Sequence, residues 1–200
     1  MIVFHIVGLA GFLNAQTVSI FLKLVPFHLL LMFLLIYVDQ ANKNNAFFFA
    51  LLTIYLSGFF IELAGVKTEL IFGKYAYGST LGIKLWDIPL LIGINWVLLV
   101  FGVSSALSYV PFGSKYFKVS IGAIVMVLLD RLIEPVAVKF DYWSWQSGRI
   151  PLQNYLAWFV ISWLMLFVIF RFKFEKRNAT AAVLLLVQFL FFAILNKWAF

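Results

Sequence analysis

The chain has 200 residues, of which 64% are hydrophobic and 20% aromatic, and it contains no cysteine. A soluble domain has roughly half of its residues apolar, so this composition predicts an integral membrane protein and excludes disulfides, thiolate metal sites and cysteine nucleophiles. The net charge of +7 is typical of membrane proteins, which collect Lys and Arg in loops and near anionic lipid, so we expect membrane lipids and no nucleic acid as partners.

Successive apolar runs predict one all-α domain, residues 1–200, built as a polytopic bundle of about seven transmembrane helices. Asn14, Gln16 and Thr17 interrupt the first run, and Pro26 is expected in the first turn of the second. Segment 64–87 is rich in glycine and aromatic residues, which indicates an interfacial or re-entrant segment covered by protein. The expected spans are 2–20, 24–38, 46–63, 88–109, 117–138, 153–171 and 179–197.

With seven spans, segments 64–87 and 139–152 emerge on the same side of the bundle. His28 lies toward that side, and only Asp39 and Glu175 among the acids lie on the other. The basic run 171–177 is typical of a cytoplasmic loop, but lysines also share the acidic side, so the orientation stays open. The acids that converge on one side are Glu62, Glu69, Asp87, Asp130, Glu134 and Asp141.

Asp130 and Glu134 are four residues apart in an otherwise apolar run, so they share one helix face. Carboxyl groups inside a membrane segment usually face a protein interior or a wet cavity, and two close together cannot both ionise easily. We expect one of them to hold a proton, as a general acid requires. The alternative is a structural network with Arg131, Lys139 or Arg149. Proline 135 is expected to bend or end the helix.

Glu62 ends the third expected span and leads directly into the glycine-rich segment, which makes it either a third site acid or an interfacial residue. Aromatic residues surround these acids, and they form either an interfacial belt or a group of faces that stabilises a cation. Two amides at membrane depth could position a water or bond a neighbouring helix. The candidate binding residues are Trp143, Trp145, Tyr75, Tyr77, Asn95, Trp96, Asn154 and Trp158.

Two histidines are too few for a histidine-rich di-iron oxygenase, and the chain has no G-x-G-x-x-G, P-loop or G-x-S-x-G motif. We therefore expect no metal and no cofactor. What remains is acid chemistry on an apolar substrate.

Two long stretches resemble the carotenoid biosynthesis protein family, which includes membrane-embedded carotenoid hydratases. They are "ELAGVKTELIFGKYAYGSTLGIKLWDIPLLIGINW" (62–96) and "DRLIEPVAVKFDYWSWQSGRIPLQNYLAW" (130–158). The chain has Glu69 where the family usually has glycine, and Glu134 where the family often has aspartate. The matching positions are Glu62, Gly65, Thr68, Phe72, Gly73, Tyr75, Tyr77, Gly78, Gly82, Pro89, Asn95, Trp96, Asp130, Glu134, Pro135, Trp143, Trp145, Pro151, Asn154 and Trp158.

The resemblance implies a carotenoid 1,2-hydratase, a cofactor-independent hydro-lyase of the cell membrane that acts on lycopene or γ-carotene. Glu134 or Asp130 would protonate the terminal double bond of an acyclic end. Water held by the other acid, by Glu62 or by Asn154 would then attack the tertiary cation. A homo-oligomer or association with other carotenoid enzymes is also expected. The alternatives are a lycopene-cyclase-type enzyme that uses the same cation, and a non-enzymatic transporter or carotenoid-binding protein.

Overall fold

The computed structural model describes residues 1–198, which form seven helices and four short strands. The all-α bundle predicted from the hydrophobic runs is confirmed. The helices are α1 (Ile2–Leu13), α2 (Val18–Asp39), α3 (Asn45–Thr68), α4 (Leu91–Ser108), α5 (Lys115–Lys139), α6 (Leu152–Ile169) and α7 (Ala179–Trp198). The strands are β1 (Tyr75–Tyr77), β2 (Lys84–Leu85), β3 (Ile88–Pro89) and β4 (Trp143–Trp145).

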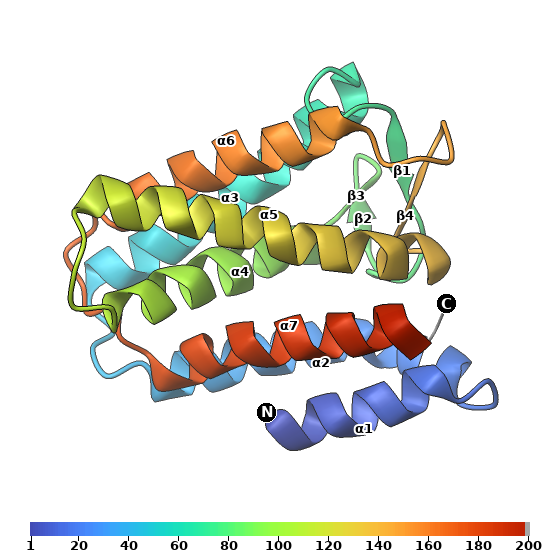
Figure 1. Cartoon of the computed structure of the whole chain (residues 1–200), viewed down its shortest axis with the longest axis horizontal. Coiled ribbons are helices and arrows are strands. Elements are labelled where there is room, and N and C mark those ends of the chain that lie inside the picture. The colour runs from blue at the N-terminus through green and yellow to red at the C-terminus, as the bar shows by residue number, and fades with distance from the viewer. Residues whose placement is uncertain (199–200) are drawn as a thin grey trace.

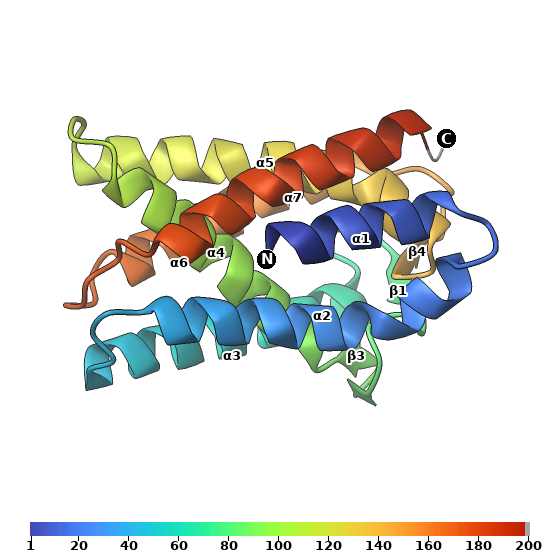
Figure 2. The ribbon, with the colours of Figure 1, turned by 90° about the horizontal axis from the view of Figure 1, so that it is seen from below.

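Helix α4 is the centre of the bundle. It contacts α2, α3, α5, α6 and α7, and its interior-facing residues are buried along nearly the whole helix. Helices α3 to α6 form one group, and α1, α2 and α7 form a second group beside them (Figure 1). Within the second group α1 lies between α2 and α7 (Figure 2).

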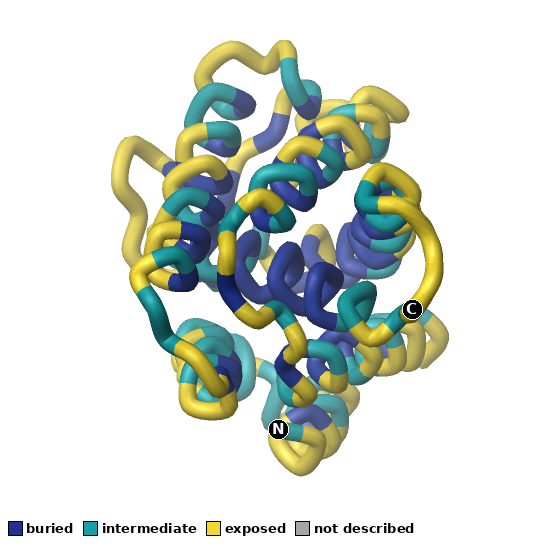
Figure 3. Tube along the Cα trace, turned by 90° about the vertical axis from the view of Figure 1, so that its left-hand side faces the viewer, coloured by how far each residue is buried: buried dark blue, intermediate teal, exposed yellow. Residues whose placement is uncertain are grey.

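The outer surface of the bundle is apolar, as expected of a protein surrounded by lipid. Buried residues gather at the centre of the ring of helices, and exposed residues cover its outside (Figure 3). Among the described residues, five helices (α2, α3, α4, α6 and α7) are long and apolar enough to cross a membrane. Helix α5 is equally long but carries more charge, and its two acids, Asp130 and Glu134, are buried inside the protein rather than turned to lipid.

Three predicted helix ends were wrong. The third helix continues to Thr68 rather than ending at residue 63, and the other two lie where a polar turn or a proline was misread. The first helix ends at Leu13 rather than near residue 20, because the carbonyl of Asn14 accepts bonds from Thr17 and Val18 in a turn. At 1.5 Å per residue, α1 is about 18 Å long, too short to cross a hydrocarbon core of about 30 Å. The second helix therefore starts at Val18, and Pro26 lies inside it rather than in its first turn.

Proline 135 does not end its helix, as α5 continues to Lys139. Val136 and Phe140 pack against Leu195 of α7 in a small apolar cluster, and this packing holds the last turn of α5 in place. A proline removes one backbone hydrogen bond, and neighbouring helices can compensate for that loss inside a bundle.

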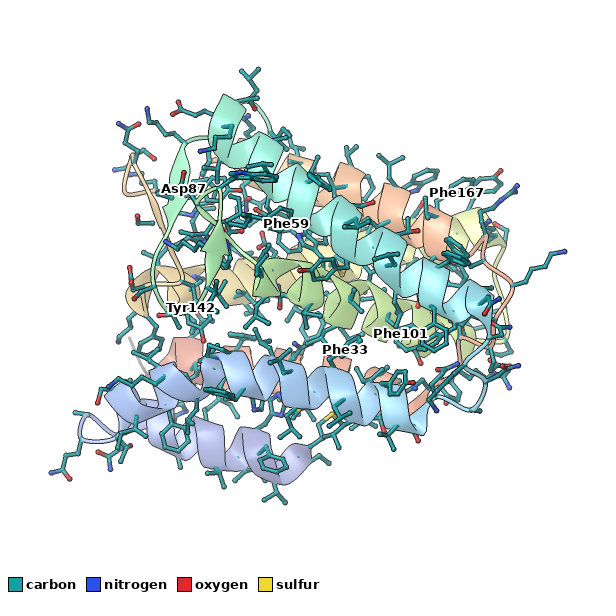
Figure 4. All side chains as sticks on the ribbon, turned by 180° about the vertical axis from the view of Figure 1, so that it is seen from behind. Phe33, Phe59, Asp87, Phe101, Tyr142 and Phe167 are labelled. Carbon is teal, nitrogen blue, oxygen red and sulfur yellow. The ribbon has the colours of Figure 1, made fainter. Side chains whose placement is uncertain are left out.

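Short strands were not predicted, and they organise one end of the bundle. Strand β1 pairs antiparallel with β4, so that Tyr75 lies opposite Trp145 and Tyr77 opposite Trp143. Strands β2 and β3 form a second, smaller pair. Asp87 lies at this end of the molecule and Phe167 at the other, while Phe33 and Phe101 lie in the packed interior between them (Figure 4). The acids Asp39 and Glu175 lie at the end opposite the strands, where Asp39 accepts a bond from the backbone of Thr180.

Helix α3 ends in a residue with left-handed backbone geometry. Glu69 has φ 60° and ψ 1°, and its backbone N–H bonds to the carbonyl of Gly65. Glycine adopts this conformation without the steric cost that a Cβ brings, so glycine would be the favoured residue at this position.

We expect Glu69→Gly to be more stable than Glu69→Ala by about 1 kcal/mol, because alanine keeps the Cβ that strains the left-handed conformation. Both variants lose the ion pair of Glu69 with Lys74, so this loss cancels in the comparison. Thermal unfolding of the two purified variants in the same detergent measures the difference. Equal midpoints would show that the helix end relaxes to another conformation.

Candidate active site

The three acids of the predicted site are all buried near the strand end of the bundle. Glu62 of α3 is 4% exposed, and Asp130 and Glu134 of α5 are each 1% exposed. Removing a carboxyl group from water is costly unless hydrogen-bond donors replace the lost water. The structure supplies such donors from the β1–β4 sheet and from helices α4 and α6.

Strands β1 and β4 each turn two aromatic side chains inward. Tyr75 and Tyr77 are buried while Ala76 between them is exposed, and the Trp-Ser-Trp sequence of β4 follows the same alternation. Because residues directly opposite each other in an antiparallel pair share one face of the sheet, the two tyrosines and two tryptophans form one aromatic layer. The Tyr75 and Trp145 ring centroids are 5.2 Å apart.

The loop after β1 is held directly against the end of α5. The backbone N–H of Gly78 bonds to the carbonyl of Tyr142, and Thr80 donates to the carbonyl of Phe140. A side chain at position 78 would overlap the backbone carbonyl of Asp141, so this close approach requires glycine. The contact fixes the aromatic layer relative to the acids of α5.

Glu62 receives three side-chain hydrogen bonds. The hydroxyls of Tyr75 and Tyr77 donate to Oε2 at 2.6 and 2.7 Å, and the indole Nε1 of Trp96 donates to Oε1 at 3.0 Å. Burial raises the pKa of both tyrosines well above the usual value, and the Glu62 carboxyl raises it further. Both phenols therefore stay protonated at any physiological pH.

Glu134 also receives three bonds, but all of them come from N–H groups. The indoles of Trp143 and Trp145 donate to Oε2 at 3.0 and 2.8 Å, and Asn154 Nδ2 lies 3.3 Å from Oε1. All three donors are uncharged.

Asn154 joins the two acids of α5. Its Nδ2 donates to Asp130 Oδ2 at 2.9 Å and also contacts Glu134. The second oxygen of Asp130, Oδ1, is buried and has no hydrogen-bond partner among the described residues. The amide therefore fixes the relative position of two carboxyl groups that lie one helical turn apart.

Trp96 and Trp158 close the interior side of the site. Their rings stack with centroids 4.4 Å apart and planes 20° from parallel. Trp96 itself fits only because Gly58 faces it across the α3–α4 contact, where a Cβ would lie 2.6 Å from the indole.

A small pocket of about 30 Å³ lies between the two glutamates, and we call it the polar pocket. A site of this size with several polar partners holds about one water molecule. Asp130 is not among its lining residues and lies behind Asn154. The lining residues are Glu62, Phe72, Tyr75, Tyr77, Ile92, Asn95, Ile133, Glu134, Trp143, Trp145, Asn154 and Trp158.

A much larger cavity of about 370 Å³ adjoins the polar pocket, and we call it the apolar cavity. It is lined mainly by aliphatic and phenylalanine side chains of α1, α2 and α7. The two spaces share the walls Ile92, Asn95, Ile133 and Trp143. A long apolar ligand in the larger space could therefore present one end to the glutamates.

All the predicted site residues meet at this place, but their contacts could not be read from the sequence. The sequence left open whether the tryptophans form an interfacial belt or offer their faces to a cation, and it did not indicate that Trp143 and Trp145 donate their N–H groups to Glu134. His5, His28 and Gln188 line the apolar cavity but were not among the predicted site residues, although His28 was expected toward the acidic side. In the sequence each of them is a polar side chain in an otherwise apolar helix. Because such isolated residues are common, this pattern alone does not indicate a site.

The sequence profile of the family described as "Carotenoid biosynthesis protein" matches residues 20–200. The chain belongs to this family. A curated relative, the bisanhydrobacterioruberin hydratase of Haloarcula japonica, is 27% identical over 135 residues, which are 64% of this chain and 45% of the relative. The chain thus aligns with less than half of that protein's length. No solved structure matches the chain.

The family match covers every residue of the polar pocket, whereas α1, with His5, precedes it. Together with its long apolar helices, the match makes this carotenoid biosynthesis protein a membrane protein.

We expect Tyr75→Phe to lower the free energy of unfolding by about 1–3 kcal/mol, because it leaves a buried acid without one of its donors. Tyr116→Phe serves as the matched control, since Tyr116 is 62% exposed, and it should change stability by less than about 0.5 kcal/mol. Chemical or thermal unfolding in detergent measures both. Equal effects would contradict a structural role for the bond to Glu62.

Proposed function

We propose that this chain is a carotenoid hydratase that adds water across the terminal C1–C2 double bond of an acyclic carotenoid end. The observation that carries the proposal is the polar pocket, in which two glutamates face a space for about one water beside a large apolar cavity. The family and the hydratase relative support the same reaction class. The substrate class that we propose is that of lycopene and γ-carotene.

The apolar cavity is suited to the end of a polyene rather than to a whole one. A 150 Å³ cavity holds one benzene ring, so about 370 Å³ corresponds to roughly fifteen carbon atoms. The rest of a carotenoid would remain in the bilayer. Each encounter would therefore present one end of the chain to the glutamates.

The partners of the two glutamates suggest different roles for them. An indole N–H can only donate, so Glu134 Oε2, which faces two indoles, cannot itself carry a proton. A phenol can donate or accept, so Glu62 can hold or release a proton while Tyr75 and Tyr77 remain its partners. We therefore propose Glu62 as the proton donor and Glu134 as the base.

The reaction then proceeds in two steps. The π electrons of the terminal double bond take the proton of Glu62 at C2, which leaves a tertiary cation at C1 and a carboxylate on Glu62. The water in the polar pocket attacks C1 as Oε1 of Glu134 takes one of its protons, and a tertiary alcohol forms. The proton on Glu134 returns to Glu62, directly or through water, so the net change is the addition of one water.

The cation would form among aromatic rings and close to negative charge. Aromatic faces stabilise a cation by about 0.5–2 kcal/mol each, and Trp158 and Trp143 both line the polar pocket. The carboxylate of Glu134 adds a larger electrostatic term in this dry environment. Asp130 would act at a distance by holding Asn154 against Glu134.

A cyclase-type reaction is the main alternative, because it starts from the same cation. There a second double bond of the same chain, rather than water, captures C1. The polar pocket favours water, since it offers a space of about 30 Å³, enough for one water, beside both glutamates. Product mass separates the two, because hydration adds one water and cyclisation adds nothing.

We expect Glu134→Gln and Glu62→Gln each to lower the hydration rate at least about a hundredfold, the size of a lost general acid or base. The matched control is Glu175→Gln, the same change at an exposed position outside the site, and it should keep the original rate. The assay follows lycopene by chromatography and mass analysis after incubation with purified, normally folded protein. Full activity in both site variants would contradict the mechanism.

The pH profile distinguishes the roles of the two acids. A proton donor must be protonated, so the rate falls as pH rises through its pKa; a base must be ionised, so the rate falls as pH decreases. We therefore expect the residual activity of Glu62→Gln to lose the alkaline decline, and that of Glu134→Gln to lose the acidic one. If Glu62→Gln instead lost the acidic decline and Glu134→Gln the alkaline one, Glu134 would be the proton donor and Glu62 the base.

A further inference from the structure

The apolar cavity contains a group of polar side chains that the proposed reaction does not use. His5 comes from α1, His28 from α2 and Gln188 from α7, and all three line the cavity. We call these residues the His–Gln cluster. Polar groups inside a membrane protein are costly and usually functional, so the cluster requires an explanation of its own.

The two histidines contact each other directly. Their Nε2 atoms are 3.4 Å apart, and the rings meet edge to face with centroids 4.7 Å apart. His5 Nδ1 lies 3.2 Å from the carbonyl of Met1, so it carries the proton and leaves Nε2 as an acceptor. His28 Nε2–H then donates to His5, and His28 Nδ1 becomes an acceptor.

Gln188 is the unsatisfied member of the cluster. It is 8% exposed, and its carbonyl Oε1 has no hydrogen-bond partner among residues 1–198. Phe191, one turn further along α7, packs its ring against His5 and so keeps this part of α7 beside the histidines. A buried acceptor without a donor costs about 1–3 kcal/mol, which a ligand with a suitable donor would recover.

We propose that the His–Gln cluster binds the hydroxyl group of an isoprenoid alcohol whose chain lies in the apolar cavity. A hydroxyl can donate to Gln188 Oε1 and accept from the amide nitrogen of the same side chain. A ketone or aldehyde has no donor and would leave Oε1 unsatisfied. No lysine or arginine lines the described cavity, so a phosphate or carboxylate would be buried without a counter-charge.

The proposal deepens the proposed function, because the same cavity would hold the polyene that reacts at the glutamates. The hydroxyl has two sources with the same chemistry. It belongs either to a substrate that was hydroxylated in an earlier reaction or to the alcohol that this protein makes. In the first case the cluster selects substrates, and in the second it retains product.

Direct binding tests the cluster without turnover. The probes are lycopene and lycopene that carries one tertiary hydroxyl at one end, and the signal is the quenching of tryptophan fluorescence in purified protein. We expect the unaltered protein to bind the alcohol about tenfold more tightly than the hydrocarbon, as one buried hydrogen bond would give. Gln188→Leu should remove this preference, so that the two polyenes bind with similar affinity.

The control variant is Gln16→Leu, the same substitution at an exposed position outside the cavity, and it should keep the preference. An unaltered protein without any preference for the alcohol overturns the proposal. Equal weakening of both polyenes by Gln188→Leu does the same, because it shows that the cluster shapes the cavity or binds only water.

Kinetics separate the two sources of the hydroxyl. If the cluster selects substrates, Gln188→Leu raises KM for the hydroxylated polyene relative to KM for lycopene. If it retains product, the variant instead weakens product inhibition and leaves both KM values alone. Preferential binding of the alcohol by a protein that hydrates no polyene would overturn the proposed function but not the role of the cluster.

Discussion

The cost of burying carboxyl groups in a membrane protein shapes the whole strand end of this molecule. Glu62 and Glu134 each receive three hydrogen bonds from uncharged donors, and those donors come from four different elements. The β1–β4 pair supplies two of the three donors of each glutamate. Stability and chemistry therefore depend on the same bonds, because the groups that make burial tolerable also set where protons reside.

The number of helices could be predicted from the sequence because it follows from local composition. The convergence of the acids could be predicted because successive helices end on alternate sides of the bundle. Hydrophobic runs locate helices, but they locate ends poorly, as Pro26 and Pro135 show by lying within helices rather than at their boundaries. A proline inside a bundle loses one hydrogen bond, and packing by neighbouring helices decides whether the helix continues.

The pairing of β1 with β4 could not be predicted in this way. Tyr-Ala-Tyr and Trp-Ser-Trp are three-residue strands separated by two helices, and neither has a local pattern long enough to indicate a sheet. Their alternation becomes visible only when each is seen beside the other. For the same reason the sequence identified the tryptophans as site residues but not the N–H groups through which Trp143 and Trp145 hold Glu134.

The two glutamates have closely related surroundings, and the small difference between them carries the chemical meaning. Each stands near the end of a helix that leads into a strand, and each meets two aromatic residues spaced two apart on that strand. On one side the donors are phenols, which can reverse a hydrogen bond; on the other they are indoles, which cannot. A similar frame, used twice, thus gives one acid whose partners can adapt to a change in protonation and one whose Oε2 faces donors alone. In the proposed hydration the first acid would donate the proton and the second would accept one from water, and both line the same water-sized pocket.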